Sequence, residues 1–245
     1  MNFNHLILKS LLFVGMSAYL IAAPTKCPQF FPNKVAPDIS IKYIEICNTE
    51  YVTAFSTDYK NPLYSAEHLT TESIQAAGKL TRKDAFHTDT NVPSDKQSSQ
   101  KAYVGTGYDK GHVVPAADAS TMTAQFETFS MANMTPQVGD NNRNLWRMLE
   151  IYTRDLTKTH KDVYMISGPI FTQNDKKLSD GTQVPDAYFK ILYIPDNNTT
   201  ICFYCKNLPK QERQQVKVSD IEKMTGYKFS QIPEDTKDKI MSIVK

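Results

Sequence analysis

The sequence predicts an α+β domain built on a largely antiparallel β-sheet. Runs rich in β-branched and aromatic residues have the pattern of strands, and they occupy residues 41–48, 51–56, 162–171, 187–195 and 199–207. One long helical pattern lies among them, at residues 140–159. Strand runs with a single long helix between them are typical of α+β domains, so we expect this architecture.

The bulk composition is that of a globular protein with a substantial core. The chain has 245 residues, enough for one large domain or at most two small ones, and 40% of them are hydrophobic. The formal net charge is only +2. A polyanionic partner would therefore have to be held by a local basic patch and not by overall charge.

Residues 1–23 are expected to be a secretory signal peptide. Lys9 precedes a run without charge, residues 10–24, which is too short to span a membrane. No Arg appears before Arg82, which argues against a mitochondrial transit peptide; an uncleaved membrane anchor is the alternative. We expect a secreted or periplasmic protein without a stable membrane span, whose net charge falls from +2 to +1 because the removed segment holds one Lys and no acid.

Export would favour disulfides among the four cysteines. Four cysteines allow three connectivities. The sequence does not choose among them. Cys202 and Cys205 lie in an expected strand, where positions three apart are separated by roughly 10 Å, too far to bridge without a turn. The favoured pair is Cys27–Cys47. A single C-x-x-C without a second pair nearby is poor support for a zinc site.

Residues 24–60 are expected to form a cysteine-containing segment packed on a main domain that spans residues 61–245. Residues 79–100 are polar and have the composition of a long surface connection, which in compact domains is often functional. A short helix is expected within residues 117–130, followed by a turn at Pro136.

The long helix at residues 140–159 has an N-cap candidate in Asp140 or Asn141. Its core-facing stripe consists of Leu145, Leu149, Tyr152 and Leu156. Two short amphipathic helices are expected near the C-terminus, at residues 219–229 and 234–244.

The stretch "GYDKGHVVPAAD" places Asp109, Lys110 and His112 within four residues, with Gly107 and Gly111 as expected hinges. Alone, it could be no more than a polar turn. A histidine is the side chain best suited to act as a base near neutral pH, and an unperturbed imidazole has a pKa of about 6.5. The stretch completes neither a G-x-G-x-x-G phosphate loop nor an H-E-x-x-H zinc motif.

The long helix supplies a second group of polar residues. Asn142 and Glu150 are eight residues apart and therefore lie about 80° from each other on one broad face. Arg154 follows Glu150 by four residues. By itself this pattern would be a solvated helix face with one Glu–Arg pair.

Taken together, three motifs resemble the DNA/RNA non-specific endonuclease family, which has a ββα-metal (His-Me finger) active site and includes secreted bacterial nucleases and endonuclease G. The motifs are "DKGH" at 109–112, "NMTPQ" at 133–137, and "NRNLWRMLE" at 142–150. The resemblance extends over roughly residues 60–207. It implies a Mg²⁺-dependent endonuclease that cleaves DNA and RNA and leaves 5′-phosphate ends, with Mn²⁺ or another divalent cation as alternatives.

The resemblance also implies roles for individual residues. His112 matches the general base, and Asn142 matches the single direct metal ligand, so the cation keeps most of its waters. Glu150 matches a carboxylate that orients water on the metal. Arg82 and Arg154 match basic residues that hold the reacting phosphate.

Three further positions belong to the expected site. Asp109 is expected to fix the turn or the imidazole, and Asn133 to support the site and the bound substrate by hydrogen bonding. Lys110 stands where the family usually has Arg, which keeps the charge but loses the bidentate fork. This change leaves a catalytically weakened nucleic-acid-binding protein of the same fold as the alternative. A disulfide-held structural or adhesion protein of the envelope, which would need none of these residues, is a third reading.

The expected partners are DNA and RNA, contacted through their phosphates, and a second copy of the chain in a possible homodimer. His87, in the polar connection, is expected to be exposed or to approach the substrate. His68 and His160 have the sequence context of structural residues.

Overall fold

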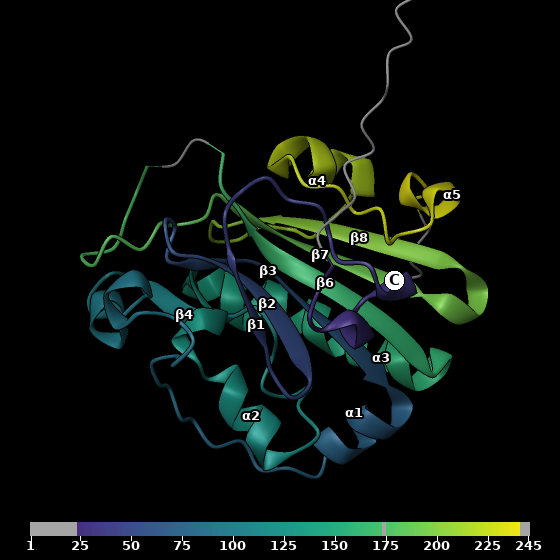
Figure 1. Cartoon of the computed structure of the whole chain (residues 1–245), viewed down its shortest axis with the longest axis horizontal. Helices are drawn as coiled ribbons and strands as arrows, with labels where there is room; N and C mark the ends of the chain where they lie inside the picture. The colour runs from purple at the N-terminus through teal and green to yellow at the C-terminus, as the bar shows by residue number, and fades with distance from the viewer. Residues whose placement is uncertain (1–23, 173–174, 241–245) are drawn as a thin grey trace, which may run out of the picture.

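The computed structural model describes residues 24–172 and 175–240 (Figure 1). The expected signal peptide lies outside the described residues. Seven strands form one sheet in the order β1-β2-β3-β6-β7-β8-β9, and every neighbouring pair is antiparallel. Their bounds are Ile44–Cys47, Tyr51–Ser56, Asn61–Thr70, Asp162–Ile170, Ala187–Ile194, Thr199–Lys206 and Gln214–Gln215. The predicted α+β class with an antiparallel sheet is confirmed.

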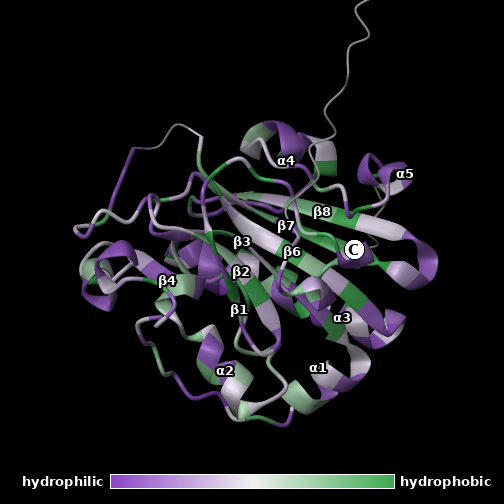
Figure 2. Ribbon diagram, viewed as in Figure 1, coloured by the Kyte–Doolittle hydropathy of each residue, from purple (hydrophilic) through white to green (hydrophobic). Residues whose placement is uncertain are grey.

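The sheet is buried on both faces, which explains why its central strands are almost continuously apolar. Side chains of β7 alternate between two cores: Phe189 and Ile191 pack towards α4 (Val218–Thr225), whereas Tyr188 and Leu192 pack towards α3 (Arg147–His160). Figure 2 shows hydrophobic residues along β6, β7 and β8. The face covered by α3 is the one that carries the residues of interest.

The long helix begins with one wide turn. Residues Asn141–Trp146 are π-helical and continue directly into α3. The predicted N-cap is wrong: Asp140 already has helical backbone angles, and its carboxylate instead accepts hydrogen bonds from the Asn144 side chain at 2.8 Å and the Lys210 N–H at 2.6 Å. Single π-helical turns often occur at functional sites.

A separate two-stranded ribbon carries the first motif. Strand β4 (Tyr108–His112) pairs antiparallel with β5 (Met134–Val138). The predicted turn at Pro136 is wrong, because Pro136 lies within β5, opposite Lys110. A two-stranded ribbon tolerates proline where no ladder donor is needed, and the Pro136 carbonyl accepts a hydrogen bond from the Tyr188 hydroxyl at 2.8 Å.

The remaining helices are short. They are α1 (Thr71–Ala77), α2 (Met122–Thr128), which corresponds to the helix expected within 117–130, and α5 (Glu234–Lys237). Helix α4 ends at Gly226, whose φ of +74° suits glycine. Both C-terminal helices are therefore shorter than the sequence predicted. No helix within the described ranges is long and apolar enough to cross a bilayer.

The N-terminal segment is part of the sheet. Strands β2 and β3 form a hairpin whose turn contains the expected domain boundary between residues 60 and 61. Residues 44–56 thus supply two strands of the sheet and are not merely packed on it. Leu63 and Ala66 on β3 lie in the same core as Val52 and Ala54 on β2, so the two parts share one core.

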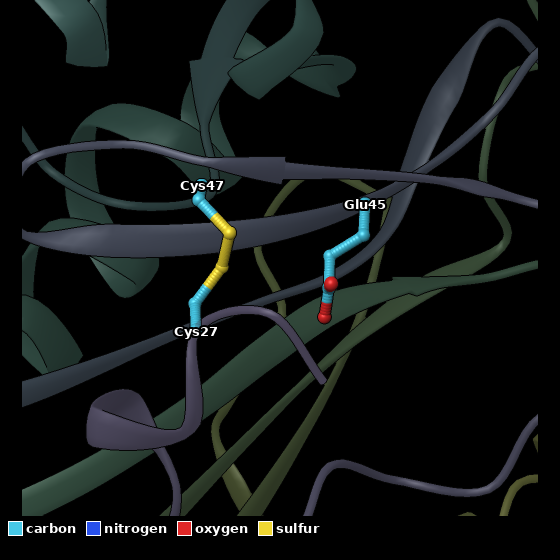
Figure 3. A group of neighbouring side chains, drawn as sticks. All are labelled: Cys27, Glu45 and Cys47. Atoms are coloured by element: carbon cyan, nitrogen blue, oxygen red, sulfur yellow. A yellow bond between two sulfur atoms is a disulfide. The ribbon is translucent and has the colours of Figure 1, made fainter. Parts of the chain in front are cut away.

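The predicted disulfide between Cys27 and Cys47 is confirmed (Figure 3). Cys202 and Cys205 are buried free thiols on β8. Glu45 lies beside the disulfide, and its carboxylate accepts the Lys26 N–H at 2.8 Å. These two cysteines and Glu45 do not make a metal centre, because the two sulfurs are bonded to each other and offer no thiolate.

Candidate active site

The first strand of the ribbon, the start of the long helix and the segment after α1 meet around one cleft of about 540 Å³. Of the residues singled out from the sequence, six line it: Arg82, Lys110, His112, Asn142, Glu150 and Arg154. They are spread over more than seventy positions of the chain, so only folding brings them together. Asp109 and Asn133 do not line the cleft.

His112 is the last residue of β4 and is half-buried against two aromatic rings. Its ring lies 4.9 Å from that of Phe129 in an edge-to-face contact and 5.8 Å from that of Phe86. Its Nε2 is shielded from solvent and has no hydrogen-bond partner among the described residues. Burial, with the nearby cations Arg82 and Lys110, lowers the pKa of His112 to about 3. The imidazole is therefore neutral at neutral pH, whereas an unperturbed histidine with a pKa of about 6.5 would be partly protonated.

The two glycines of the motif have different roles. Gly107 has a φ of +80°, a backbone conformation that favours glycine, and it leads into β4. Gly111 does not act as the hinge expected from the sequence. It lies within β4, where a Cβ atom would be 2.3 Å from the side-chain oxygen of Gln137. Glycine is needed there so that Gln137 can pack across the ribbon.

Asn142 lies in the π-helical turn, and its amide is oriented by Asp109. The Asn142 Nδ2 donates to Asp109 Oδ2 at 3.0 Å, while Arg143 donates to the same carboxylate through Nε at 2.9 Å and Nη2 at 2.6 Å. Burial opposes the charge on Asp109, but these hydrogen bonds outweigh it and lower the pKa of the carboxyl. Asp109 therefore holds the helix start, and not the imidazole.

The oxygen chemistry of the cleft fits a hard divalent cation. With its nitrogen engaged by Asp109, the Asn142 amide presents its oxygen as the remaining ligand atom. The Glu150 carboxylate lines the same cleft. Mg²⁺ prefers oxygen ligands and keeps several waters, so one amide oxygen with a nearby carboxylate is a suitable donor set.

Glu150 projects from α3 and is partly buried. Burial raises the pKa of Glu150 to about 7, with Lys190 opposing the shift and Asp118 adding to it. Lys190 comes from β7 and is fully buried, with its Nζ 4.9 Å from the centre of the Trp146 ring. Burial lowers the pKa of Lys190, and the acids Glu150 and Glu67 oppose that shift.

Arg154 is held in place by a buried acid. Its Nη1 donates to Asp118 Oδ1 at 2.7 Å, and the Asp118 side chain is only 1% exposed. Glu67 on β3 is also buried, and burial together with the neighbouring Asp118 raises its pKa well above the usual value. Arg154 therefore pairs with a buried carboxylate that lies beside a second buried acid.

Two further cations of the cleft, Arg82 and Lys110, lie over aromatic rings. The Arg82 guanidinium is 5.0 Å from the centre of the Phe129 ring and donates to Asp84 at 2.7 Å. The Lys110 Nζ is 4.4 Å from the centre of the Phe86 ring. Cation–π contacts of this kind keep a charged group at a fixed place without neutralising it.

Asn133 supports the ribbon from beneath. It is buried, and its side-chain nitrogen donates to the carbonyls of Val114 and Thr128, while its oxygen accepts the Val114 N–H at 3.0 Å. The expected hydrogen-bonding support is present. Because all of these partners are backbone groups, Asn133 has no atom directed at a substrate in this structure.

The other three histidines of the described residues do not line the cleft. His68 bonds Asp162 at 2.9 Å, and His160 bonds Asp196 at 3.1 Å. His87, expected to be exposed or to approach the substrate, is half-buried and stacks on Phe126 with ring centres 4.1 Å apart.

Sequence reasoning missed several residues around the cleft. They are Glu67, Asp118, Arg143, Arg147 and Lys190. The only available signal was a charged residue inside an apolar strand pattern, as for Lys190 in "AYFKILYIP" and Glu67 in "PLYSAEHLT". A buried charge in such a place must be paired, but its partner depends on the fold.

Comparison with known proteins gives one family model and several similar proteins. The model of the family described as DNA/RNA non-specific endonuclease matches residues 33–236. Nuclease C1 from Cunninghamella echinulata var. echinulata is 32% identical over 200 residues, which cover 73% of this chain and 79% of that protein. A nuclease from a Nostoc species is 31% identical over 215 residues, covering 81% of this chain and 76% of the relative.

A mitochondrial relative and a solved structure are similar too. Human nuclease EXOG, mitochondrial, is 29% identical over 207 residues, which cover 75% of this chain and 56% of the relative. The crystal structure of the EndoG/EndoGI complex, which concerns EndoG inhibition, contains a chain with a TM-score of 0.70 and 25% identity. The match covers 88% of this chain and 96% of that one.

Proposed function

Because the chain belongs to the family of DNA/RNA non-specific endonucleases, and is therefore a metal-dependent nuclease, we propose that it hydrolyses phosphodiester bonds of both DNA and RNA with Mg²⁺. One observation carries the proposal. A neutral imidazole shares one cleft with an oriented amide oxygen, a carboxylate and five basic side chains. This combination suits attack of water on a phosphodiester.

His112 is the general base in this proposal. Its lowered pKa keeps it unprotonated at neutral pH, and its ring lines the cleft, with Nε2 on the side that is shielded from solvent. It can therefore accept the proton of a water molecule placed between it and the phosphate. The rings of Phe86 and Phe129 limit the positions that the imidazole can take.

The divalent cation would be held by the Asn142 amide oxygen. When bound, such an ion stabilises the charge that develops on the phosphate and on the leaving oxygen. Asp109 orients the amide, and Glu150, in its ionised form, orients water beside it by accepting hydrogen bonds.

The reacting phosphate would be held by cations that line the cleft on two sides. Arg154 is directed by Asp118, and Arg82 rests on Phe129. Lys110 supplies a third charge, although without the planar fork of an arginine. These contacts address phosphate and not bases, so we expect little sequence preference and binding that weakens with salt.

We also propose that the mature protein begins near residue 24 and acts outside the reducing cytosol. The Cys27–Cys47 disulfide supports this, since such bonds persist in oxidising compartments. Relatives include bacterial and mitochondrial nucleases, so the compartment has to be measured. Fractionation of cells that make the full chain would show a shortened protein outside the cytosol; an uncut cytosolic chain would refute the proposal.

A gel assay tests the catalytic proposal. Purified mature protein is incubated with plasmid DNA and with total RNA, with Mg²⁺ or with EDTA, beside His112→Ala. The control is His160→Ala, which removes an imidazole that bonds Asp196 and does not line the cleft. We expect cleavage of both polymers by the wild type and the control, and none by His112→Ala or in EDTA.

The alternative of a catalytically weakened binding protein gives a different result in the same assay. The wild type would then retard both polymers on the gel but leave them intact. Cleavage that survives His112→Ala would refute the proposed base, and cleavage of DNA alone would refute the broad substrate range.

A further inference from the structure

A second pocket opens off the cleft that contains His112, between α1 and α3. Its volume is about 320 Å³, and it shares Arg82 and Arg154 with the first cleft. Its walls are apolar, with Ile74 and Leu80 among them, and Lys158 stands at its border. The cleft therefore does not end at Arg154 but continues towards the C-terminal end of α3.

The helix places three charged residues along one line. Glu150, Arg154 and Lys158 follow each other at intervals of four, which puts them on the same side of α3. Each interval advances about 6 Å along the helix axis, so Lys158 lies about 12 Å from Glu150. A nucleic acid strand rises about 3.4 Å per nucleotide, so this distance corresponds to roughly three or four nucleotides.

The second pocket has the charge of a phosphate site. Arg82, Arg154 and Lys158 line it, and no acidic residue does so among the described residues. The Lys158 Nζ lies 2.9 Å from Asp155, but both side chains are more than half exposed. Such a surface pair is weak, so a phosphate can compete for Lys158.

We propose that this pocket, named here the Lys158 pocket, is a subsite for the nucleic acid strand beside the cleaved bond. The apolar walls receive sugar and base without reading the sequence, and Lys158 binds a phosphate that is not itself cleaved. The subsite rests on the proposed function, since it presumes that the scissile phosphate lies beside His112.

Binding measurements in the inactive His112→Ala background test the subsite. The dissociation constant for a 12-nucleotide single strand is measured over a range of salt for His112→Ala alone and with Lys158→Ala added. Loss of one phosphate contact should weaken binding about threefold to tenfold at low salt and reduce the slope of log affinity against log salt by about 0.7. The matched control is Lys223→Ala on α4, whose lysine also pairs with an acid three residues earlier; it should leave the slope unchanged.

Two further variants test the subsite by an expected gain in affinity as well as by a loss. Asp155→Asn removes the acid that competes for Lys158 and should tighten binding, whereas Asp220→Asn beside Lys223 should not. In the active enzyme, the ratio of the Lys158→Ala KM to the wild-type KM should grow from a dinucleotide to a 12-nucleotide strand, because only the longer substrate reaches the pocket.

The outcomes separate the subsite from the catalytic proposal. The subsite alone is refuted if the wild type cuts nucleic acid while Lys158→Ala leaves the salt slope unchanged and gives the same KM ratio at both substrate lengths. A wild-type protein that neither cuts nor binds refutes the proposed function and the subsite with it. A reduced slope for Lys223→Ala equal to that of Lys158→Ala would show a general charge effect and would also overturn the subsite.

Discussion

The Asp109 carboxylate accepts a hydrogen bond from the Asn142 side-chain nitrogen at 3.0 Å, across 33 positions of the sequence. This contact joins the ribbon that carries His112 to the helix that carries Glu150. It also fixes which end of the Asn142 amide faces the cleft. The positions of the proposed base and of the proposed metal ligand are therefore coupled through one carboxylate.

Replacing Asp109 should weaken cation binding before it affects the chemistry. In Asp109→Ala the Asn142 amide is no longer oriented, and loss of such support typically costs 10–100-fold in metal affinity or activity. We expect the Mg²⁺ concentration for half-maximal activity to rise by about that factor, with much of the rate recovered at high Mg²⁺. A titration of activity against Mg²⁺ measures both quantities.

The matched control is Arg143→Ala, which removes the other partner of Asp109 and leaves the bond to Asn142 intact. This variant should change the Mg²⁺ concentration for half-maximal activity much less than Asp109→Ala does. Equal shifts in the two variants would mean that Asp109 acts through Arg143 and not through Asn142.

The acid limb of the pH profile, where kcat/KM falls, should result from protonation of Glu150 and not of His112. The pKa of Glu150 is raised to about 7, whereas His112 is protonated only near pH 3. As the pH falls below about 7, Glu150 loses its charge and kcat/KM should fall; a bound cation moves this limb to lower pH, because it favours the carboxylate. Profiles of kcat/KM between pH 5 and 9 for the wild type and Glu150→Gln check this. A limb near 6.5 that persists in Glu150→Gln would point to His112 instead.

His112 should also make stability depend on pH. Its folded pKa is depressed below the unfolded value of about 6.5, so the unfolded chain takes up the proton first as the pH falls. Its contribution is present above pH 6.5 and is lost towards pH 3, at up to about 1.4 kcal/mol per pH unit. Urea unfolding of the wild type and His112→Asn between pH 4 and 7 isolates this term, since the opposing contribution of Glu150 is common to both. Parallel curves would contradict it.

Asp118 should be needed both for stability and for phosphate binding. It is buried and pairs with Arg154 at 2.7 Å. Asp118→Asn removes the charge that holds Arg154, so we expect a loss of about 1–3 kcal/mol in unfolding free energy and a higher KM. The control is Asp95→Asn, which removes the acid of an exposed pair with Lys96 and should be nearly neutral. A normal KM in Asp118→Asn would show that Arg154 does not depend on its partner.

The disulfide should contribute measurably to stability. It closes a loop with a sequence separation of 20 residues. By the loop-entropy relation, replacing both Cys27 and Cys47 by Ser should lower the unfolding free energy by about 3 kcal/mol. Urea unfolding with and without reductant measures this, and the double variant should not respond to reductant. A further loss on adding reductant to the variant would implicate the buried thiols of β8.

The sequence by itself determined the local parts of this protein. The apolar runs predicted the sheet, the helical periodicity predicted α3, and the spacing of Asn142, Glu150 and Arg154 placed them on one side of a helix. These predictions succeed because they depend on backbone periods of two and 3.6 residues, which neighbouring residues set among themselves.

Only the tertiary structure decided how the parts are joined. It made residues 134–138 a strand despite Pro136, because β4 supplies a partner for that segment. It brought Lys190 of β7 beside Glu150, and it placed Asp109 in a hydrogen bond with Asn142 and not with the imidazole. Such pairings follow from packing between segments far apart in the chain. Burial then sets the pKa of His112 and of Glu150, and no local pattern of residues contains that information.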